Sequence, residues 1–128
     1  MIDQRFVDPI EVPRTAELSQ AVRVGNLIFC SGQIGIGPDG KIVDPRDTRA
    51  QIVQAFKNLE TVLEGAGGSL DQVVKITSYL LDDVDRDALV DVRRRFFKPP
   101  YPASTLVIVK GLARPDYRYE IDAIAVVR

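Results

Sequence analysis

The sequence predicts an α+β domain in which two helices cover one face of a mixed β-sheet. Two segments carry apolar residues at the three- and four-residue steps of an amphipathic helix, whereas the other apolar runs are short and bounded by glycine, proline or asparagine. Along the chain these segments follow the order β-β-β-α-β-α-β-β. No internal repeat or linker divides the 128 residues, which we interpret as a single domain spanning residues 1–128.

The first part of the sheet is expected to be a hairpin within residues 21–34. Gly25-Asn26 lies between two apolar runs, and this dipeptide is a two-residue turn signal. A second turn region follows at residues 35–40. After it, residues 41–43 (Lys-Ile-Val) are expected to form a short third strand.

The first helix is expected at residues 48–64, with Asp47 as its N-cap. Its apolar residues share one face: Ile52, Phe56, Leu59, Leu63 and Ala66. Gly65, Gly67 and Gly68 are expected to end it, because glycine readily adopts the left-handed conformation found after helix C-termini.

The second helix is expected at residues 86–97, with Asp85 as its N-cap. Its apolar face consists of Leu89, Val92 and Phe96. Pro99-Pro100 ends it, because proline cannot continue a helix.

Three more strands are expected at residues 73–81, 104–110 and 117–127. In the first of them the even-numbered residues face one way and the odd-numbered residues the other. Apolar residues occupy both faces of the strands, as between positions 121 and 126. Two helices with one apolar stripe each can cover only one face of such a sheet. The other face needs a partner surface, so we expect an oligomer.

The composition excludes several kinds of site. The 17 basic and 18 acidic residues nearly cancel, which gives no support for a nucleic-acid or membrane surface. No apolar run approaches the ~20 residues that span a bilayer, and the N-terminus does not resemble a signal peptide, so we expect a cytoplasmic protein. With no histidine and a single cysteine, Cys30, the chain has no His-based catalytic unit or metal site and no internal disulfide.

Several segments also carry the motifs of a known family. They are residues 19–27, the loop Ser31-Gly32-Gln33-Ile34, residues 51–67, residues 70–77, Phe96-Phe97 with Pro100-Tyr101-Pro102-Ala103, and residues 120–125. In number, order and spacing they resemble the Rid (YjgF/YER057c/UK114) family over about residues 18–127. The resemblance implies a chorismate-mutase-like fold and homotrimers whose sheets line a central barrel, with ligand clefts between subunits.

The resemblance also implies a reaction. Deaminating members hydrolyse a 2-enamine or 2-imine acid to a keto acid and ammonia without a metal or organic cofactor. An arginine directly after Pro-Ala holds the substrate carboxylate, and a carboxylate in the last strand positions water. Glu120 matches that last-strand carboxylate. Its alternative role is an ordinary ion pair with Arg118 or with an arginine of a neighbouring subunit.

The family arginine is missing from this chain. Ser104 follows Pro102-Ala103, Leu18 stands where a tyrosine is common, and Val90 replaces an asparagine of the second helix. Loss of a charge-assisted bidentate contact should weaken binding of the same acid by about 2 to 5 kcal/mol. These departures predict a changed pocket and a substrate other than the usual one.

The predicted site consists of Glu120 as the catalytic residue and a set of substrate-binding residues: Ser31, Gly32, Ala103, Ser104 and Thr105. Gly32 permits close approach of the backbone to a ligand and Ser31 offers a hydroxyl, although both also suit an ordinary strand end. Ser104 is not expected to be a nucleophile, because no histidine is present to activate it.

A cation that replaces the missing arginine has two possible sources. Lys110, Arg114 and Arg118 lie on or between the last two strands. Arg93, Arg94 and Arg95 lie on the second helix, where a run of charge usually forms a solvated face.

Three functions remain open from the sequence. The first is hydrolytic deamination, or a related water addition or tautomerisation, of an enamine- or imine-like small molecule in an intersubunit cleft. The second is a non-catalytic metabolite-binding or regulatory trimer. The third is redox or chaperone-like behaviour through an exposed Cys30, although most single cysteines are small core residues.

Overall fold

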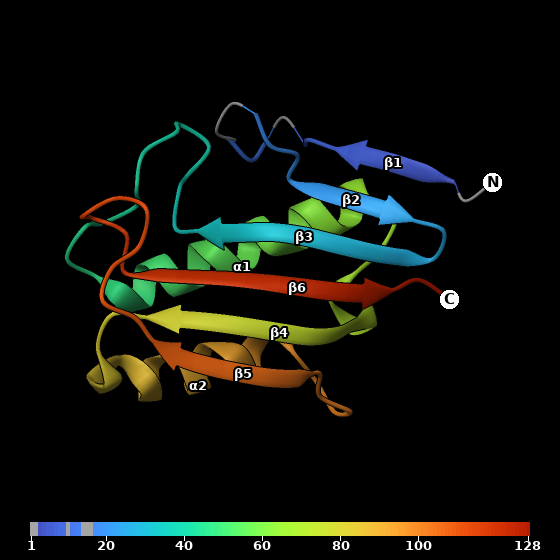
Figure 1. Ribbon diagram of the computed structural model, residues 1–128. Coiled ribbons are helices and arrows are strands. Elements are labelled where there is room, and N and C mark those ends of the chain that lie inside the picture. Colours follow the sequence, from blue (N-terminus) through green and yellow to red (C-terminus); the bar gives the residue numbers. More distant parts are fainter. Residues whose placement is uncertain (1–2, 10, 14–16) are drawn as a thin grey trace.

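In the computed structural model, which describes residues 3–9, 11–13 and 17–128, six strands form one mixed sheet and two helices lie on one of its faces (Figure 1). The elements are β1 (Gln4–Val7), β2 (Ala21–Val24), β3 (Leu27–Ile34), α1 (Thr48–Gly65), η1 (Leu70–Gln72), β4 (Val73–Leu80), η2 (Asp83–Asp85), α2 (Arg86–Phe96), β5 (Ala103–Ile108) and β6 (Tyr119–Val126). The strand order is β1-β2-β3-β6-β4-β5, in which β4 and β5 are parallel and all other neighbours antiparallel. The predicted α+β class and the two helices are confirmed.

The first three strands differ from the prediction. Residues 41–43 do not form a strand and make only one isolated bridge, between Ile36 and Ile42. The backbone of this segment bonds to its own turn, because the amide of Gly37 donates to Lys41 and that of Val43 to Gly35. The edge of β2 is instead paired by β1, an N-terminal strand that the sequence pattern did not indicate.

The helices bury the faces that the sequence predicted. The five apolar residues of α1 named above are fully buried, as are Leu89 and Val92 of α2, and the Phe96 ring stacks on Phe56 at 5.1 Å between centroids. Asp47 caps α1 as expected, since its carboxylate accepts a hydrogen bond from the amide of Ala50 at 2.9 Å.

For the second helix the predicted N-cap position is correct, but the expected capping hydrogen bond is absent. Asp85 occupies the N-cap position of α2, but its side chain makes no capping hydrogen bond. Its carboxylate lies 3.9 Å from the guanidinium of Arg118. A preceding carboxylate, Asp82, instead accepts from the amide of Val84 at the start of η2.

The predicted alternation of β4 holds only beyond its first residues. Ile76, Ser78 and Leu80 face the helices as one set, but Val74 is 47% exposed and Val73 only 6% exposed. The pairing with β6 shifts register between Val73 and Lys75, and such a bulge reverses the face on which the preceding residues lie.

On the other face of the sheet no helix of the described residues packs; we call it the open face, and it is apolar over β1, β2 and β3. Register places Phe6, Val22, Phe29 and Ile124 in one row across β1, β2, β3 and β6. Leu27 and Val107 belong to the same face, because residues two apart along a strand share a side. The helices pack on the opposite side of the sheet (Figure 1). Among the described residues, no helix is long and apolar enough to cross a bilayer.

Candidate functional site

The sheet divides the predicted site residues between its two faces. Glu120 lies on the open face, opposite Tyr79 of β4. Ser104 pairs with the buried Ile76 and therefore faces the helices. Its neighbours Ala103 and Thr105 face the other way, and the Thr105 hydroxyl accepts a hydrogen bond from the Lys75 ammonium at 2.6 Å. A single chain thus brings Glu120 and Ser104 to different sides of one strand layer.

Glu120 lies directly against Gly32. A Cβ atom at Gly32 would lie 2.2 Å from Oε2 of Glu120, so only a glycine leaves room for this carboxylate position. Glu120 is half-buried, and its pKa is raised, first by burial and then by the negative charge of Asp122. A carboxylate with a raised pKa accepts a proton more readily than an ordinary glutamate does, which suits a general base.

The alternative role of Glu120 as a partner of Arg118 is contradicted. Arg118 donates from Nε to the Thr48 hydroxyl at 2.7 Å and lies near Asp85, at the N-terminal ends of α1 and α2. Within the described part of the chain no cation forms an ion pair with Glu120. Pairing with an arginine of a neighbouring subunit stays a prediction.

A β-bulge positions Gly32. The pairing of β3 with β6 shifts between Cys30 and Gln33, which leaves Ser31 and Gly32 outside the regular ladder. The Ser31 hydroxyl donates to the carbonyl of Ser19 at 2.6 Å, and the buried Gln33 amide donates to the Ser31 carbonyl at 3.2 Å. The Ser31 side chain therefore holds the bulge in place, and its role toward a ligand stays a prediction.

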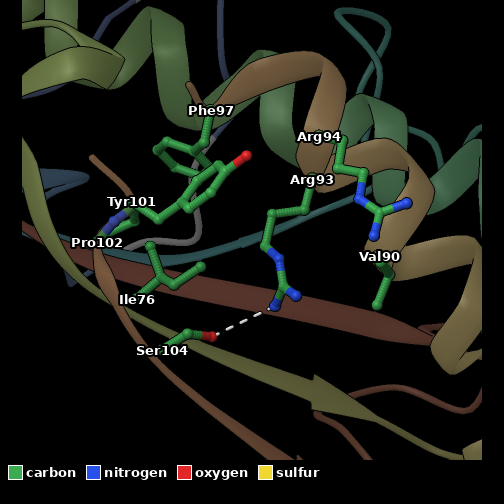
Figure 2. Close-up of a pocket in the computed structure, with 8 residues that line it drawn as sticks. All are labelled: Ile76, Val90, Arg93, Arg94, Phe97, Tyr101, Pro102 and Ser104. Atoms are coloured by element: carbon green, nitrogen blue, oxygen red, sulfur yellow. Dashed lines mark hydrogen bonds between the residues drawn. The ribbon is translucent and has the colours of Figure 1, made fainter. Parts of the chain in front are cut away.

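The second group of site residues surrounds a cavity of about 290 Å³ between α2 and β5 (Figure 2). Its walls are formed by Ile76, Val90, Arg93, Arg94, Phe97, Tyr101, Pro102 and Ser104. Val90 and Ser104, two of the positions that we expect to differ from the family pattern, thus share one cavity. Leu18, the third, lies elsewhere and is 42% exposed.

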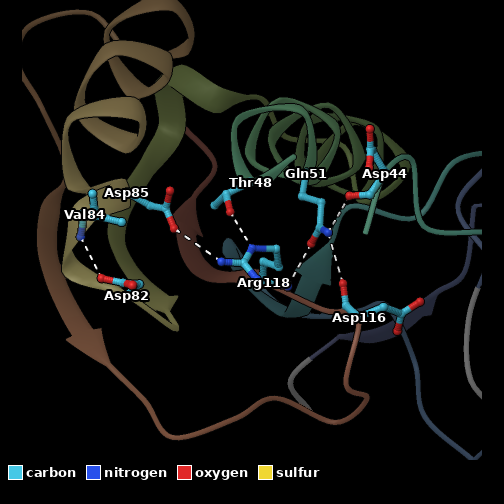
Figure 3. A network of polar contacts seen from close by, with 8 residues as sticks. All are labelled: Asp44, Thr48, Gln51, Asp82, Val84, Asp85, Asp116 and Arg118. Atoms are coloured by element: carbon cyan, nitrogen blue, oxygen red, sulfur yellow. Dashed lines mark hydrogen bonds and ion pairs between the residues drawn. The ribbon is translucent and has the colours of Figure 1, made fainter. Parts of the chain in front are cut away.

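Of the candidate cations outside the second helix, Arg118 is bound to other side chains, and Lys110 and Arg114 lie away from the Ser104 cavity. Arg118 belongs to a polar network around the buried Gln51, whose amide donates to the carbonyls of Asp44 and Asp116 and accepts from the Arg118 amide (Figure 3). Lys110 and Arg114 line a separate cavity beyond the C-terminal end of β5. These contacts leave the second helix as the source of a cation near Ser104.

The arginine run of α2 is only partly a solvated face. Arg95 is exposed and pairs with Asp91 at 3.1 Å, and Arg94 is exposed at the cavity. Arg93 is half-buried and directs its guanidinium to Ser104, with 3.4 Å between Nη1 and Oγ (Figure 2).

Cys30 is not an exposed thiol. It is 8% exposed and lies opposite Ala123 on the side of the sheet that faces the helices. Burial, and then the charge of Asp122, raise its pKa to about 12. A thiol in this environment is inert, which contradicts the hypothesis of redox or chaperone-like behaviour through Cys30.

Sequence reasoning missed the polar side chains next to Glu120 on the open face. The Tyr79 hydroxyl donates to the Asp122 carboxylate at 3.0 Å, and Lys75 lies on the same side of β4. The odd positions of β4 and the even positions of β6 alternate with buried residues, and that pattern was the available signal. No group of three or more potential metal ligands occurs among the described residues.

Comparison with known proteins extends over nearly the whole chain. Residues 10–127 match the model of the family described as Endoribonuclease L-PSP. A 2-iminobutanoate/2-iminopropanoate deaminase of Dermatophagoides farinae is 37% identical over 109 residues, which are 85% of this chain and 84% of that protein.

Solved structures agree with the fold. RidA from the Antarctic bacterium Psychrobacter sp. PAMC 21119 superposes with a TM-score of 0.90 at 34% identity, over 96% of this chain and 99% of that one. TdcF of E. coli, solved with bound serine, superposes with a TM-score of 0.90 at 29% identity, over 97% and 99% of the two chains. The chain therefore has the chorismate-mutase-like α+β fold.

Proposed function

Because the chain belongs to the endoribonuclease L-PSP family, which is the Rid family that its motifs resemble, we propose that it acts hydrolytically on an enamine- or imine-like small molecule. The observation that carries the proposal is the contact of Glu120 with Gly32. A half-buried carboxylate with a raised pKa lies against a bulge whose backbone leaves it just enough room. The imine deaminase activity in the name of the D. farinae relative supports this reaction class.

In the proposed reaction Glu120 handles the proton of the attacking water. Its carboxylate accepts a proton as the water oxygen bonds to the imine carbon, which gives a tetrahedral carbinolamine. That first proton passes to the imine nitrogen, which completes the neutral carbinolamine. The carboxylate then takes the proton of the new hydroxyl group and delivers it to the nitrogen, the carbon–nitrogen bond breaks with its electron pair on nitrogen, and the products are a carbonyl compound and ammonia. The raised pKa makes the Glu120 carboxylate a stronger base for taking the proton from water than an ordinary glutamate. Related water additions and tautomerisations would use the same carboxylate.

We place this chemistry in a homotrimer. In one chain Glu120 and Ser104 lie on opposite faces of the sheet, so the predicted site is incomplete without a second subunit. The open face exposes Phe6, Leu27, Phe29 and Val107 to solvent, and apolar surface of this kind is normally buried against a partner. Contact between subunits would cover this face and bring the Glu120 region of one chain near the Ser104 cavity of the next.

The proposed substrate differs from the usual 2-imino acid. The cavity carries a serine hydroxyl and a valine side chain where deaminating relatives are expected to carry arginine and asparagine. The same observation favours one alternative, a trimer that binds a metabolite for regulation without converting it.

The experiment that tests the reaction measures ammonia release from freshly generated 2-iminobutanoate and 2-aminoacrylate. The wild type is compared with Glu120→Gln and Ser104→Arg. If the wild type releases ammonia and Glu120→Gln releases less, the result supports the proposed reaction on the usual substrate and shows that Ser104 does not prevent it. Activity only in Ser104→Arg shows that the catalytic groups are intact and that the natural substrate is different. If neither the wild type nor Ser104→Arg releases ammonia, the result favours the binding alternative.

A further inference from the structure

We propose that Arg93 binds an anionic group of the ligand in the cavity between α2 and β5. The charge that recognises the ligand would thus come from the helix, while Ser104 of the strand contributes only a hydroxyl. This proposal deepens the proposed function and relies on it for the reaction. The binding step itself can be measured without turnover.

The first argument is the missing partner of Arg93. Its guanidinium has five N–H donors. Among the described residues, its one hydrogen bond to another side chain is the long one, 3.4 Å, to the Ser104 hydroxyl. Within the described residues no carboxylate forms an ion pair with Arg93, whereas Arg49 and Arg95 share Asp91. A guanidinium with unused donors and no counter-charge can pair with an incoming anion.

The second argument is the shape of the cavity. Apolar walls from Ile76, Val90 and Phe97 surround the guanidinium, which is directed inward to Ser104 (Figure 2). Low-polarity walls strengthen the attraction between charges. The volume of about 290 Å³ matches the lower end of small-molecule sites.

The third argument concerns the class of ligand. Two oxygens of a carboxylate match the two parallel donors of a guanidinium, and a third contact is available from the Ser104 hydroxyl. The apolar walls fit a short hydrocarbon chain beside that carboxylate. Arg94 at the cavity adds positive potential without entering the contact between Arg93 and Ser104. The geometry therefore favours a small carboxylic acid with an apolar substituent.

The test compares binding of 2-oxobutanoate with binding of its uncharged methyl ester. Dissociation constants come from amide chemical shifts in ¹H–¹⁵N NMR spectra of the wild type, Arg93→Gln, Arg93→Lys and Arg95→Gln. Arg95→Gln is the matched control, because this arginine is two residues along the same helix and pairs with Asp91. Thermal unfolding verifies that all four proteins are folded.

We expect the wild type to bind the acid at least tenfold more tightly than the ester. Arg93→Gln should abolish this preference, Arg93→Lys should keep part of it because the point charge remains, and Arg95→Gln should leave it unchanged. An Arg93→Gln protein that prefers the acid as strongly as the wild type does, or a wild type without any preference, overturns the proposal. If the preference depends on Arg93 and no imine is hydrolysed, this inference stands and the proposed reaction fails.

Discussion

Replacement of Gly32 by alanine should separate the activity of this protein from its stability. The new Cβ would lie 2.2 Å from Oε2 and 2.7 Å from Cδ of Glu120. A comfortable separation between carbon atoms is about 3.5 to 4.0 Å, so the carboxylate must move by about 1 Å or more. The carboxylate is the free end of a flexible side chain, and we expect it to move while the backbone stays in place.

The expected magnitudes follow from this displacement. A side chain forced off its preferred rotamer costs about 0.5 to 1.5 kcal/mol. Replacing glycine by alanine at a compatible backbone position returns about 0.4 to 1 kcal/mol through the unfolded chain. Gly32 has no positive φ, so its backbone accepts alanine. The free energy of unfolding should thus change by less than about 1 kcal/mol, whereas a catalytic group misplaced by 1 Å costs about 100-fold in rate.

The assay combines urea unfolding with steady-state hydrolysis of the imine substrate. Gly111→Ala is the matched control, because nothing lies within 4 Å of the added Cβ and its φ is not positive. The carboxyl ¹³C signal of Glu120 provides a readout that needs no substrate. In the wild type this signal should report a pKa above that of an ordinary glutamate. In Gly32→Ala the pKa should lie closer to the ordinary value, because the displaced carboxylate becomes more exposed to solvent.

Two outcomes would refute the reasoning. Gly32→Ala with the wild-type rate and an unchanged Glu120 titration would show that the contact does not position the carboxylate. A loss of activity that is just as large in a Glu120→Gln background would show that Gly32 acts by another route, since effects transmitted through one residue do not add.

The other predictions concern charge, assembly, folding and reactivity. Glu120→Gln should lower the rate by about 100-fold or more yet raise the melting temperature at pH 7. The raised pKa of Glu120 means that the folded state binds the proton more tightly than the unfolded state, so the wild type loses stability as the pH rises through that pKa. The gain in melting temperature should vanish in acid, below the ordinary glutamate pKa, where the wild type is protonated. In sedimentation, Phe29→Glu should convert a species of three times the 14.2 kDa chain mass to monomers. Val84→Glu is the control, because Val84 is also apolar and 75% exposed but lies in η2, outside the sheet, and this variant should keep the trimer. Gln51→Leu should cost about 3 kcal/mol or more in urea unfolding, because three backbone groups lose a buried partner. Cys30 should react with a thiol reagent only as fast as the protein unfolds, and a fast reaction in the native state would contradict its burial.

Local patterns were sufficient for most elements of the fold. The helices were predictable because amphipathic spacing and an N-cap such as Asp47 act within a few residues. The errors occur where distant segments compete. Residues 41–43 were expected to form the third strand, but β1 pairs with β2 instead, and the bulge in β4 arises from its pairing with β6. The Asp85 side chain makes no capping hydrogen bond to α2, because its carboxylate lies beside Arg118, which is remote in sequence.

The sequence by itself determined the α+β class, the family and the apolar residues on both faces of the sheet, and the replacement of the family arginine by Ser104 stays a prediction. Each of these depends on residue types and their spacing along the chain. Only the tertiary structure decided that Glu120 lies against Gly32 while Ser104 faces the helices, since the bulge in β3 and the register of the strands set those directions. It also singled out Arg93 from three consecutive arginines. Neighbouring helical residues point about 100° apart, so the docking of α2 on β5 determines which of them reaches Ser104.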